Sequence, residues 1–316
     1  MNLNELFERM KKALNPEKPA AHSAPVQQPE PAQQPVQQPE AAPEDPFDEA
    51  YDLAVSKNLL AKITMQTGKP FLRLTLTDQV PGISGSKVGG VPYLPADAEV
   101  PCDADGSPLQ MLAQINCTEL SALPDFPQEG LLQFWIGQDV SYGLFKEGGS
   151  RVIYYPQIDS SVTEETVRAR LAAMPKPDEP DSPLNGEFGI SLSLKSEGIS
   201  AQDVHFNPLF VRMFNEAMPA HQITDLSDLG DEIGETVYEE QGGFGHKIGG
   251  YPGFTQWDPR KEDDPRTVLL LQLDSDYGNG TTKIMWGDAG IGGFFCSPEA
   301  LAARDFSGVL YNWDCG

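Results

Sequence analysis

Cysteine is scarce in this sequence, and the few cysteines lie far apart. Only four occur in 316 residues, at Cys102, Cys117, Cys296 and Cys315, and no two of them form a Cys-x-x-Cys pair. This spacing provides neither a disulfide framework nor the paired thiolates of a common zinc site. We therefore expect reduced thiols that are mostly buried.

Long apolar runs are also missing. No stretch approaches the roughly 20 consecutive apolar residues that a membrane-spanning helix needs. The first residues, MNLNELFERMKKALN, lack the apolar core of a signal peptide. The sequence therefore predicts a cytoplasmic protein without a membrane span.

Positive charge is the third deficit. The chain has 22 Lys and Arg against 47 Asp and Glu, a net charge of −25. This balance argues against nucleic-acid binding, which draws its affinity from clustered cations. Residues 1–46 carry seven acidic and four basic side chains, a net of −3, so −22 remains for residues 47–316. The excess of acid either keeps the protein soluble or attracts a basic protein partner.

Residues 1–14 predict a short amphipathic helix. Leu3, Leu6, Phe7, Met10 and Leu14 recur at spacings of three and four residues, which places them on one helical face. A helix of about 14 residues is marginal in isolation. The sequence leaves open whether this helix docks on its own domain, on a partner or on a membrane surface, or stays a frayed end.

Residues 15–46 have a different composition, dominated by Pro, Gln, Ala and Glu. The segment Pro-Val-Gln-Gln-Pro-Glu occurs at both 25–30 and 35–40. Such a segment buries too little apolar surface to fold, and its prolines favour an extended chain of about 3.1 Å per residue. The sequence predicts a disordered linker that reaches up to roughly 100 Å. We expect residues 47–316 to fold without it.

Strand patterns dominate residues 47–316. Leu72, Leu74 and Leu76 alternate with other residues, which is typical of a strand with one buried face. Further strands are expected at 111–115, 131–136, 152–155, 188–194, 268–273, 283–286, 293–296 and 309–313. Helices are expected at 48–63, around 208–218, after the capping pair Ser161 and Glu164, and after Ser297. The prediction is an α+β, β-rich fold.

An internal repeat divides this domain into two halves. Segment 86–93, SKVGGVPY, returns 160 positions later as HKIGGYPG at 246–253. Likewise, MLAQI at 111–115 matches LLLQL 158 positions later, and GLLQF at 130–134 matches GIGGF 160 positions later. Three motifs in the same order indicate a duplicated β-rich unit. We place the repeats near 47–174 and 184–316.

The second half also carries a family resemblance. The motifs KIGGYP at 247–252, QLDSD at 272–276, WGDAG at 286–290 and LAARDFS at 301–307 resemble the YwqG-like family, a bacterial family of unknown function. The resemblance covers residues 50–316 and implies a compact, roll-like domain built from two repeats. It implies no reaction and no catalytic residue. Because YwqG-like domains resemble those proposed in bacterial toxin–immunity repertoires, it also implies an immunity-type inhibitor.

Carboxylates at the end of a strand are the first candidate ligand site. Asp274 and Asp276 follow a predicted strand, and Asp288 lies in a motif shortly after them. The spacing resembles the start of a calcium loop, but Met285 stands where an EF-hand has its final Glu. The EF-hand pattern therefore fails. A looser carboxylate site and solvated strand-end turns remain as the two interpretations.

His246, Lys247 and Trp286 complete the candidate binding residues. The sequence gives His246 no catalytic partner, and no two histidines have a metal-ligand spacing. The Gly-Gly pair after Lys247 does not match a phosphate-binding loop. Trp286 is expected in the core, with a stacking platform for a sugar or a base as the alternative. We expect no metal, no cofactor and no catalytic residue.

Two functions remain at this point. The first is a non-enzymatic binding protein that recognises a basic protein partner. The alternative is a small-molecule- or metal-binding protein, or an enzyme, that uses the strand-end carboxylates. A deep pocket lined by Asp274, Asp276, Trp286 and Asp288 favours the alternative, whereas a broad acidic face without a pocket favours the first.

Overall fold

The computed structural model describes residues 49–278 and 280–316. The helix predicted at 1–14 and the linker predicted at 15–46 lie outside the described residues. None of the helices in the described ranges is long and apolar enough to cross a membrane.

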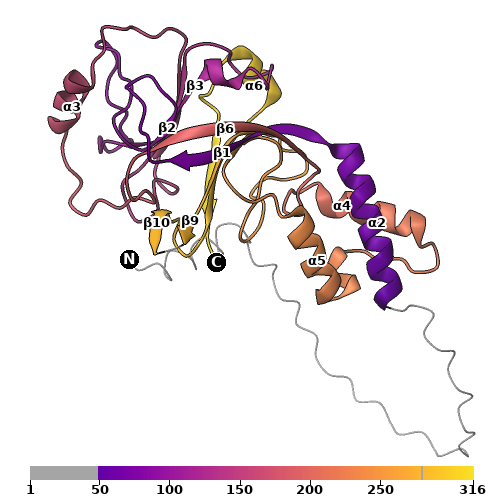
Figure 1. Ribbon diagram of the computed structural model, residues 1–316. Coiled ribbons are helices and arrows are strands. Elements are labelled where there is room, and N and C mark those ends of the chain that lie inside the picture. The colour runs from indigo at the N-terminus through magenta and orange to yellow at the C-terminus, as the bar shows by residue number, and fades with distance from the viewer. Residues whose placement is uncertain (1–48, 279) are drawn as a thin grey trace, which may run out of the picture.

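A ten-stranded antiparallel sheet organises the fold (Figure 1). Its strands are β1 (Lys69–Thr77), β2 (Lys87–Val88), β3 (Gln110–Asn116), β4 (Leu131–Ile136), β5 (Ser150–Tyr155), β6 (Phe188–Glu197), β7 (Lys247–Gly249), β8 (Val268–Asp274), β11 (Ile291–Cys296) and β12 (Leu310–Asp314). They follow one another across the sheet in the order β12-β11-β8-β7-β1-β6-β2-β3-β4-β5. A separate hairpin pairs β9 (Asp276–Gly278) with β10 (Thr281–Ile284). The predicted β-rich α+β class is confirmed.

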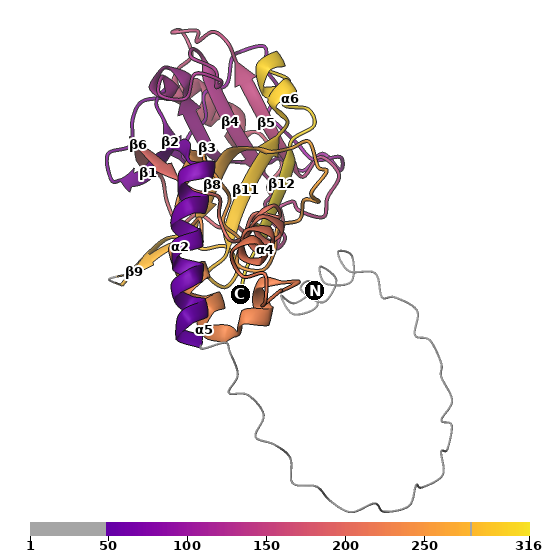
Figure 2. The ribbon, with the colours of Figure 1, turned by 90° about the vertical axis from the view of Figure 1, so that its right-hand side faces the viewer.

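The helices gather mainly on one side of the sheet. They are α2 (Glu49–Thr67), α3 (Glu164–Ala172), α4 (Phe206–Ala217), α5 (Asp231–Gln241) and α6 (Pro298–Ala303), with short 3-10 turns η1 (Cys117–Leu120) and η2 (Leu226–Leu229). Figures 1 and 2 show α2, α4 and α5 packed together as a helical layer beside the sheet. The layer has its own core, in which the rings of Phe206, Phe210 and Phe214 stack along α4.

Local capping explains where the shorter helices begin. Ser297 caps α6 as predicted, because its side chain accepts a hydrogen bond from the backbone N–H of Ala300 at 3.1 Å. The prediction that Ser161 caps α3 is wrong. The structure places Thr163 at that position, where its hydroxyl accepts from the N–H of Thr166 at 3.3 Å.

The two halves of the sheet repeat the same ladder. Lys87 on β2 pairs with Gln114 on β3, and Lys247 on β7 pairs with Gln272 on β8. The central strands cross between halves, because β1 pairs with β7 and β6 pairs with β2. Since β1 and β6 also pair with each other over nine residues of β1, the two halves share one continuous sheet.

A buried glutamine fixes the loop before β2 in the first half. The amide nitrogen of Gln114 donates to the carbonyls of Ile83 and Gly85, both at 2.9 Å. Its amide oxygen accepts from the N–H of Tyr93 at 2.8 Å. Gln114 is fully buried, so its side chain satisfies backbone groups that water cannot reach.

Gln272 does the same in the second half. Its amide nitrogen donates to the carbonyls of Gly243 and Gly245 at 3.0 and 2.9 Å, and its oxygen accepts from the N–H of Gly253 at 2.8 Å. Each bonded residue lies 160 positions after its counterpart around Gln114. The repeated sequence motifs therefore form the same hydrogen-bonded turn twice.

The sheet curls until its two ends approach each other around the main core. The ring of Phe134 on β4 lies 5.1 Å from that of Phe294 on β11. The indole N–H of Trp313 on β12 donates to the carbonyl of Ser141, beyond the end of β4, at 2.7 Å. The result is a nearly closed roll with apolar side chains inside.

Candidate functional site

His246 and Asp274 lie together where β7 begins and β8 ends. The Nδ1 atom of His246 accepts the backbone N–H of Asp274 at 2.9 Å. Its Nε2 atom lies 3.6 Å from a carboxylate oxygen of Asp276. Burial lowers the pKa of His246, although the charges of Asp274 and Asp276 oppose that shift. His246 is therefore neutral near pH 7, with its proton on Nε2 facing Asp276.

Asp274 is held in place by the turn that precedes β7. One of its oxygens accepts the N–H of Gly245 at 2.7 Å. Burial raises the pKa of Asp274, despite the hydrogen bonds that favour its charged form. The structure thus brings three of the candidates together: His246, Asp274 and the more exposed Asp276.

Lys247 points to a different partner. Its ammonium group has no exposed surface and donates to both carboxylate oxygens of Glu197, at 2.9 and 2.8 Å, and to the carbonyl of Tyr251 at 2.9 Å. Gly250 has a positive φ of 72°, and an added Cβ there would collide with the Glu197 carboxylate. This ion pair holds the Gly-Gly turn, so the geometry of Lys247 is that of a structural residue.

Trp286 and Asp288 do not join the cluster. Trp286 has no exposed surface, and its ring packs against Tyr142 and Trp313. The stacking-platform interpretation of Trp286 is therefore wrong, since a ligand cannot reach its ring. Asp288 is exposed, and no hydrogen bond or ion pair of its side chain connects it with Asp274 or Asp276 within the described ranges.

The described residues contain no group of three or more His, Cys, Asp or Glu side chains that could hold a metal ion. At least four clefts open on the described surface, and none of these four is lined by any of the six candidate residues. One of them, of about 380 Å³, lies beside Gly89 and Gly90 and the loop at Pro175–Pro177.

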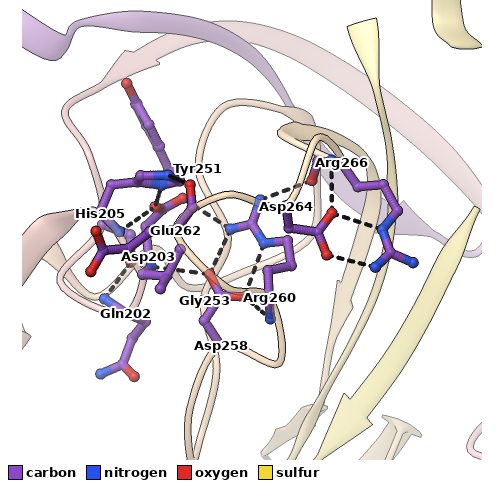
Figure 3. A network of polar contacts seen from close by, with 12 residues as sticks. Gln202, Asp203, His205, Tyr251, Gly253, Asp258, Arg260, Glu262, Asp264 and Arg266 are labelled. Atoms are coloured by element: carbon purple, nitrogen blue, oxygen red, sulfur yellow. Dashed lines mark hydrogen bonds and ion pairs between the residues drawn. The ribbon is translucent and has the colours of Figure 1, made fainter.

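A second polar cluster was missed by sequence reasoning (Figure 3). Arg260, whose side chain is 3% exposed, donates to both oxygens of Asp258 at 2.9 and 2.6 Å and to Asp203 at 3.0 Å. Asp203 and Asp258 are buried as well. Because Asp203 and Arg260 are 57 residues apart in the sequence, no local sequence motif indicates that they are in contact.

The same cluster connects α4 to the loop before β8. His205, just before α4, has Nδ1 at 2.8 Å from Asp203 and Nε2 at 3.0 Å from the carbonyl of Glu262. Arg260 also donates to the carbonyl of Arg266 at 3.2 Å. The charged groups face one another instead of an open cavity, so the geometry supports a structural role in fixing the helical layer.

His205 predicts a stability contribution that depends on pH. Burial lowers its pKa, but the hydrogen bonds to Asp203 and Glu262 and the charge of Asp203 together raise it above the ordinary 6.5. This contribution is fully present below pH 6.5 and is lost as the pH rises through the folded-state pKa. We expect His205→Gln to lower the melting temperature more at about pH 5.5 than at about pH 8.5. Equal losses at both pH values would contradict the assignment.

Acidic side chains are concentrated on one part of the helical layer. Between Met213 and Gly245 the chain has eight acidic residues and no Lys or Arg. All eight acidic side chains are exposed, and they are Glu216, Asp225, Asp228, Asp231, Glu232, Glu235, Glu239 and Glu240. Seven of them lie on or beside η2 and α5, and we call these two elements the acidic face.

An open groove of about 530 Å³ runs along the acidic face, between η2 and α5. Its walls combine apolar Leu226 and Tyr238 with acidic Asp231 and Glu235. Tyr238 is 38% exposed. Burial raises the pKa of Tyr238, and the charges of Asp314 and Asp274 add to the shift.

Comparison with known proteins finds one family match. The family model described as Domain of unknown function (DUF1963) matches residues 86–315. The chain belongs to this family. The match begins just before β2 and ends after β12, so it contains Gln114, Gln272 and the acidic face, whereas Ile83 and Gly85, which Gln114 binds, lie just before it. A search of the curated proteins finds no match.

Proposed function

We propose that this protein is a non-enzymatic interaction protein that binds a basic protein partner through the acidic face. The observation that carries the proposal is the run from Met213 to Gly245, with eight exposed acidic side chains and no Lys or Arg. A surface of one charge accelerates encounter with an oppositely charged partner.

Tyr238 supplies apolar contact area on the acidic face, and a second exposed aromatic side chain lies on the loop before β8. Tyr238 on α5 is 38% exposed, and Trp257 in the loop before β8 is 40% exposed. That loop is held by Asp314, which accepts the N–H groups of Thr255 and Gln256 at 3.2 and 3.0 Å. Tyr and Trp on a firm backbone are common anchors of protein interfaces.

The alternative function has less support. It required a pocket lined by the strand-end carboxylates and Trp286, yet Trp286 is buried and the four clefts have other walls. Asp276 remains near His246 with its side chain 39% exposed, and none of the four clefts encloses it. This position suits contact with a protein better than enclosure of a small molecule.

We extend the proposal to the biological setting. The partner is a toxin with a basic surface, and the protein is an immunity-type inhibitor in the bacterial cytoplasm. The support for this step is the resemblance of residues 50–316 to the YwqG-like family. A toxin gene next to this gene in the source organism would strengthen it, whereas a conserved metabolic neighbourhood would count against it.

Charge reversal on the acidic face tests the proposal. We expect the triple variant Glu232→Lys, Glu235→Lys, Glu239→Lys to slow association with the basic partner by about tenfold or more, with the wild-type rate falling as salt increases. The partner is obtained by pull-down at low salt, and association is measured with the purified protein. Exposed substitutions of this kind cost under about 0.5 kcal/mol of stability.

The matched control changes the same amount of charge elsewhere. Glu147, Asp178 and Glu179 are exposed and lie on other loops, and we expect their reversal to lysine to slow association much less. If both triple variants behave alike, net charge and not the acidic face governs binding. If no protein partner is retained and a metal or metabolite raises the melting temperature instead, the proposed function fails.

A further inference from the structure

We propose that the groove between η2 and α5 binds the chain's own N-terminal segment, residues 1–14, and that this segment competes there with the basic partner. The proposal rests on the proposed function, because the groove belongs to the acidic face. It adds a regulatory occupant that is part of the same chain.

The groove has the composition of a docking site for a basic amphipathic segment. Leu226 and Tyr238 provide apolar surface, and Asp225, Asp231 and Glu235 provide negative charge along the same opening. No lysine or arginine lines it. An occupant that buries apolar side chains and presents cations therefore matches both parts of the groove.

Two glycines leave space along the wall of the groove. An added Cβ at Gly230 or at Gly234 would meet no heavy atom within 4 Å. Gly234 lies inside α5, where alanine stabilises a helix better than glycine does. The described packing gives no steric reason for Gly234, whereas a helix lying in the groove would approach closely over a residue without a side chain.

Residues 1–14 have the matching chemistry. Their predicted apolar face contains Phe7 and Met10, and the segment carries Arg9, Lys11 and Lys12. Only Glu5 and Glu8 oppose these three cations. A helix this short is marginal alone, so contact with the groove would supply the burial that it lacks.

The connection is long enough for docking within one chain. The described structure begins at Glu49, the first residue of α2, and α2 packs against both α4 and α5. The described chain therefore starts in the same helical layer that contains the groove. An extended proline-rich chain of the length of residues 15–48 reaches roughly 100 Å. A flexible connection gives an effective concentration of the order of 1 mM, so a dissociation constant of about 0.1 mM is enough for the docked state to dominate.

Docking of residues 1–14 would lower the apparent affinity of the groove for the basic partner. A basic partner must displace residues 1–14 before it occupies the groove, so its apparent affinity falls in proportion to the undocked fraction. A partner with several cations overcomes this competition, whereas a weakly basic protein does not. The segment thereby adds selectivity to a surface that otherwise attracts cations of many kinds.

Hydrogen exchange in the full-length chain tests the proposal without any partner. We expect the backbone amides of residues 3–14 to exchange at least about tenfold more slowly than in the isolated peptide at about 20 mM salt, and to lose this protection at about 500 mM salt. Glu235→Lys should abolish the protection. The matched control Glu216→Lys changes the same charge on α4, outside the groove, and should retain it.

A second variant separates docking from stability. Gly234→Leu fills the groove with a good helix former, so we expect it to keep or raise the melting temperature while removing the protection of residues 3–14. Carbodiimide cross-linking identifies the contact, since it should join Lys11 or Lys12 to Asp231 or Glu235 within one chain.

Four results would overturn the proposal. Exchange of residues 3–14 at the rate of the isolated peptide in low salt would show that the segment is undocked. Protection that persists in Glu235→Lys would place the segment elsewhere. Cross-links between chains, or protection that appears only with anionic lipid vesicles, would assign the segment to a second copy or to a membrane. None of these readouts involves the basic partner, so the proposed function stands or falls separately in the association measurements.

Discussion

Replacing Arg260 with methionine is expected to lower the free energy of unfolding by about 3–5 kcal/mol, because two buried carboxylates lose their cation. Arg260 donates to Asp258 at 2.9 and 2.6 Å and to Asp203 at 3.0 Å, and all three side chains are at most 6% exposed. Methionine keeps the apolar volume, so the loss reports on charge and hydrogen bonding. Urea unfolding of both proteins at pH 7 measures the difference.

Arg266 offers a matched control for this substitution. It pairs with Asp264 as Arg260 pairs with Asp258, but its side chain is 36% exposed. Water replaces the lost contact there, so Arg266→Met should cost no more than about 1 kcal/mol. If Arg260→Met costs no more than Arg266→Met, the cluster in Figure 3 does not hold the helical layer to the loop before β8.

Gln114→Leu is expected to cost about 3 kcal/mol or more, because it leaves one backbone N–H and two carbonyls without partners in a buried turn. Gln272→Leu removes the equivalent three hydrogen bonds in the second half. Gln114 also accepts a hydrogen bond from Gln133 at 2.7 Å. Gly293 takes the place of Gln133 on β11, so we expect the loss in Gln114→Leu to exceed that in Gln272→Leu by about 1 kcal/mol.

Chemical denaturation of the two leucine variants tests this repeated arrangement. The exposed Gln222 provides the control, because its amide donates to two carbonyls near the end of α4 that water can reach. Gln222→Leu should cost less than about 1 kcal/mol. Losses of that small size in Gln114→Leu and Gln272→Leu would contradict the view that buried glutamines hold both turns.

Local patterns were sufficient for most strands but failed for α5. The alternation of Leu72, Leu74 and Leu76 predicts β1, since a strand with one buried face repeats every second residue. Residues 231–241 contain Gly234 and the β-branched Thr236 and Val237, which weaken any helical signal. The segment is helical because Ile233 and Val237 are buried against α2, in a core cluster that also contains residues of α4, and this contact is tertiary.

The candidate site was only partly accessible to prediction. The repeat pointed to His246 and Lys247, and the strand end pointed to Asp274 and Asp276. Their roles depended on partners that the sequence does not indicate. Glu197, which binds Lys247, lies 50 residues earlier on a strand that pairs with β1, not with β7. Because Glu197 is far from Lys247 in the sequence, the sequence alone does not distinguish a lysine with a structural role from a lysine that binds a ligand.

By itself, the sequence determined the β-rich class, the paired motifs of the two halves and the concentration of acid, because composition and short-range periodicity express these properties directly. Only the tertiary structure decided that β1 and β6 cross between the halves, that Trp286 is in the core, and that Arg260 lies between Asp203 and Asp258. It also decided that the acid of η2 and α5 borders a groove. Such features depend on contacts between residues far apart in the chain, and a buried charge or an open groove exists only after those residues have packed together.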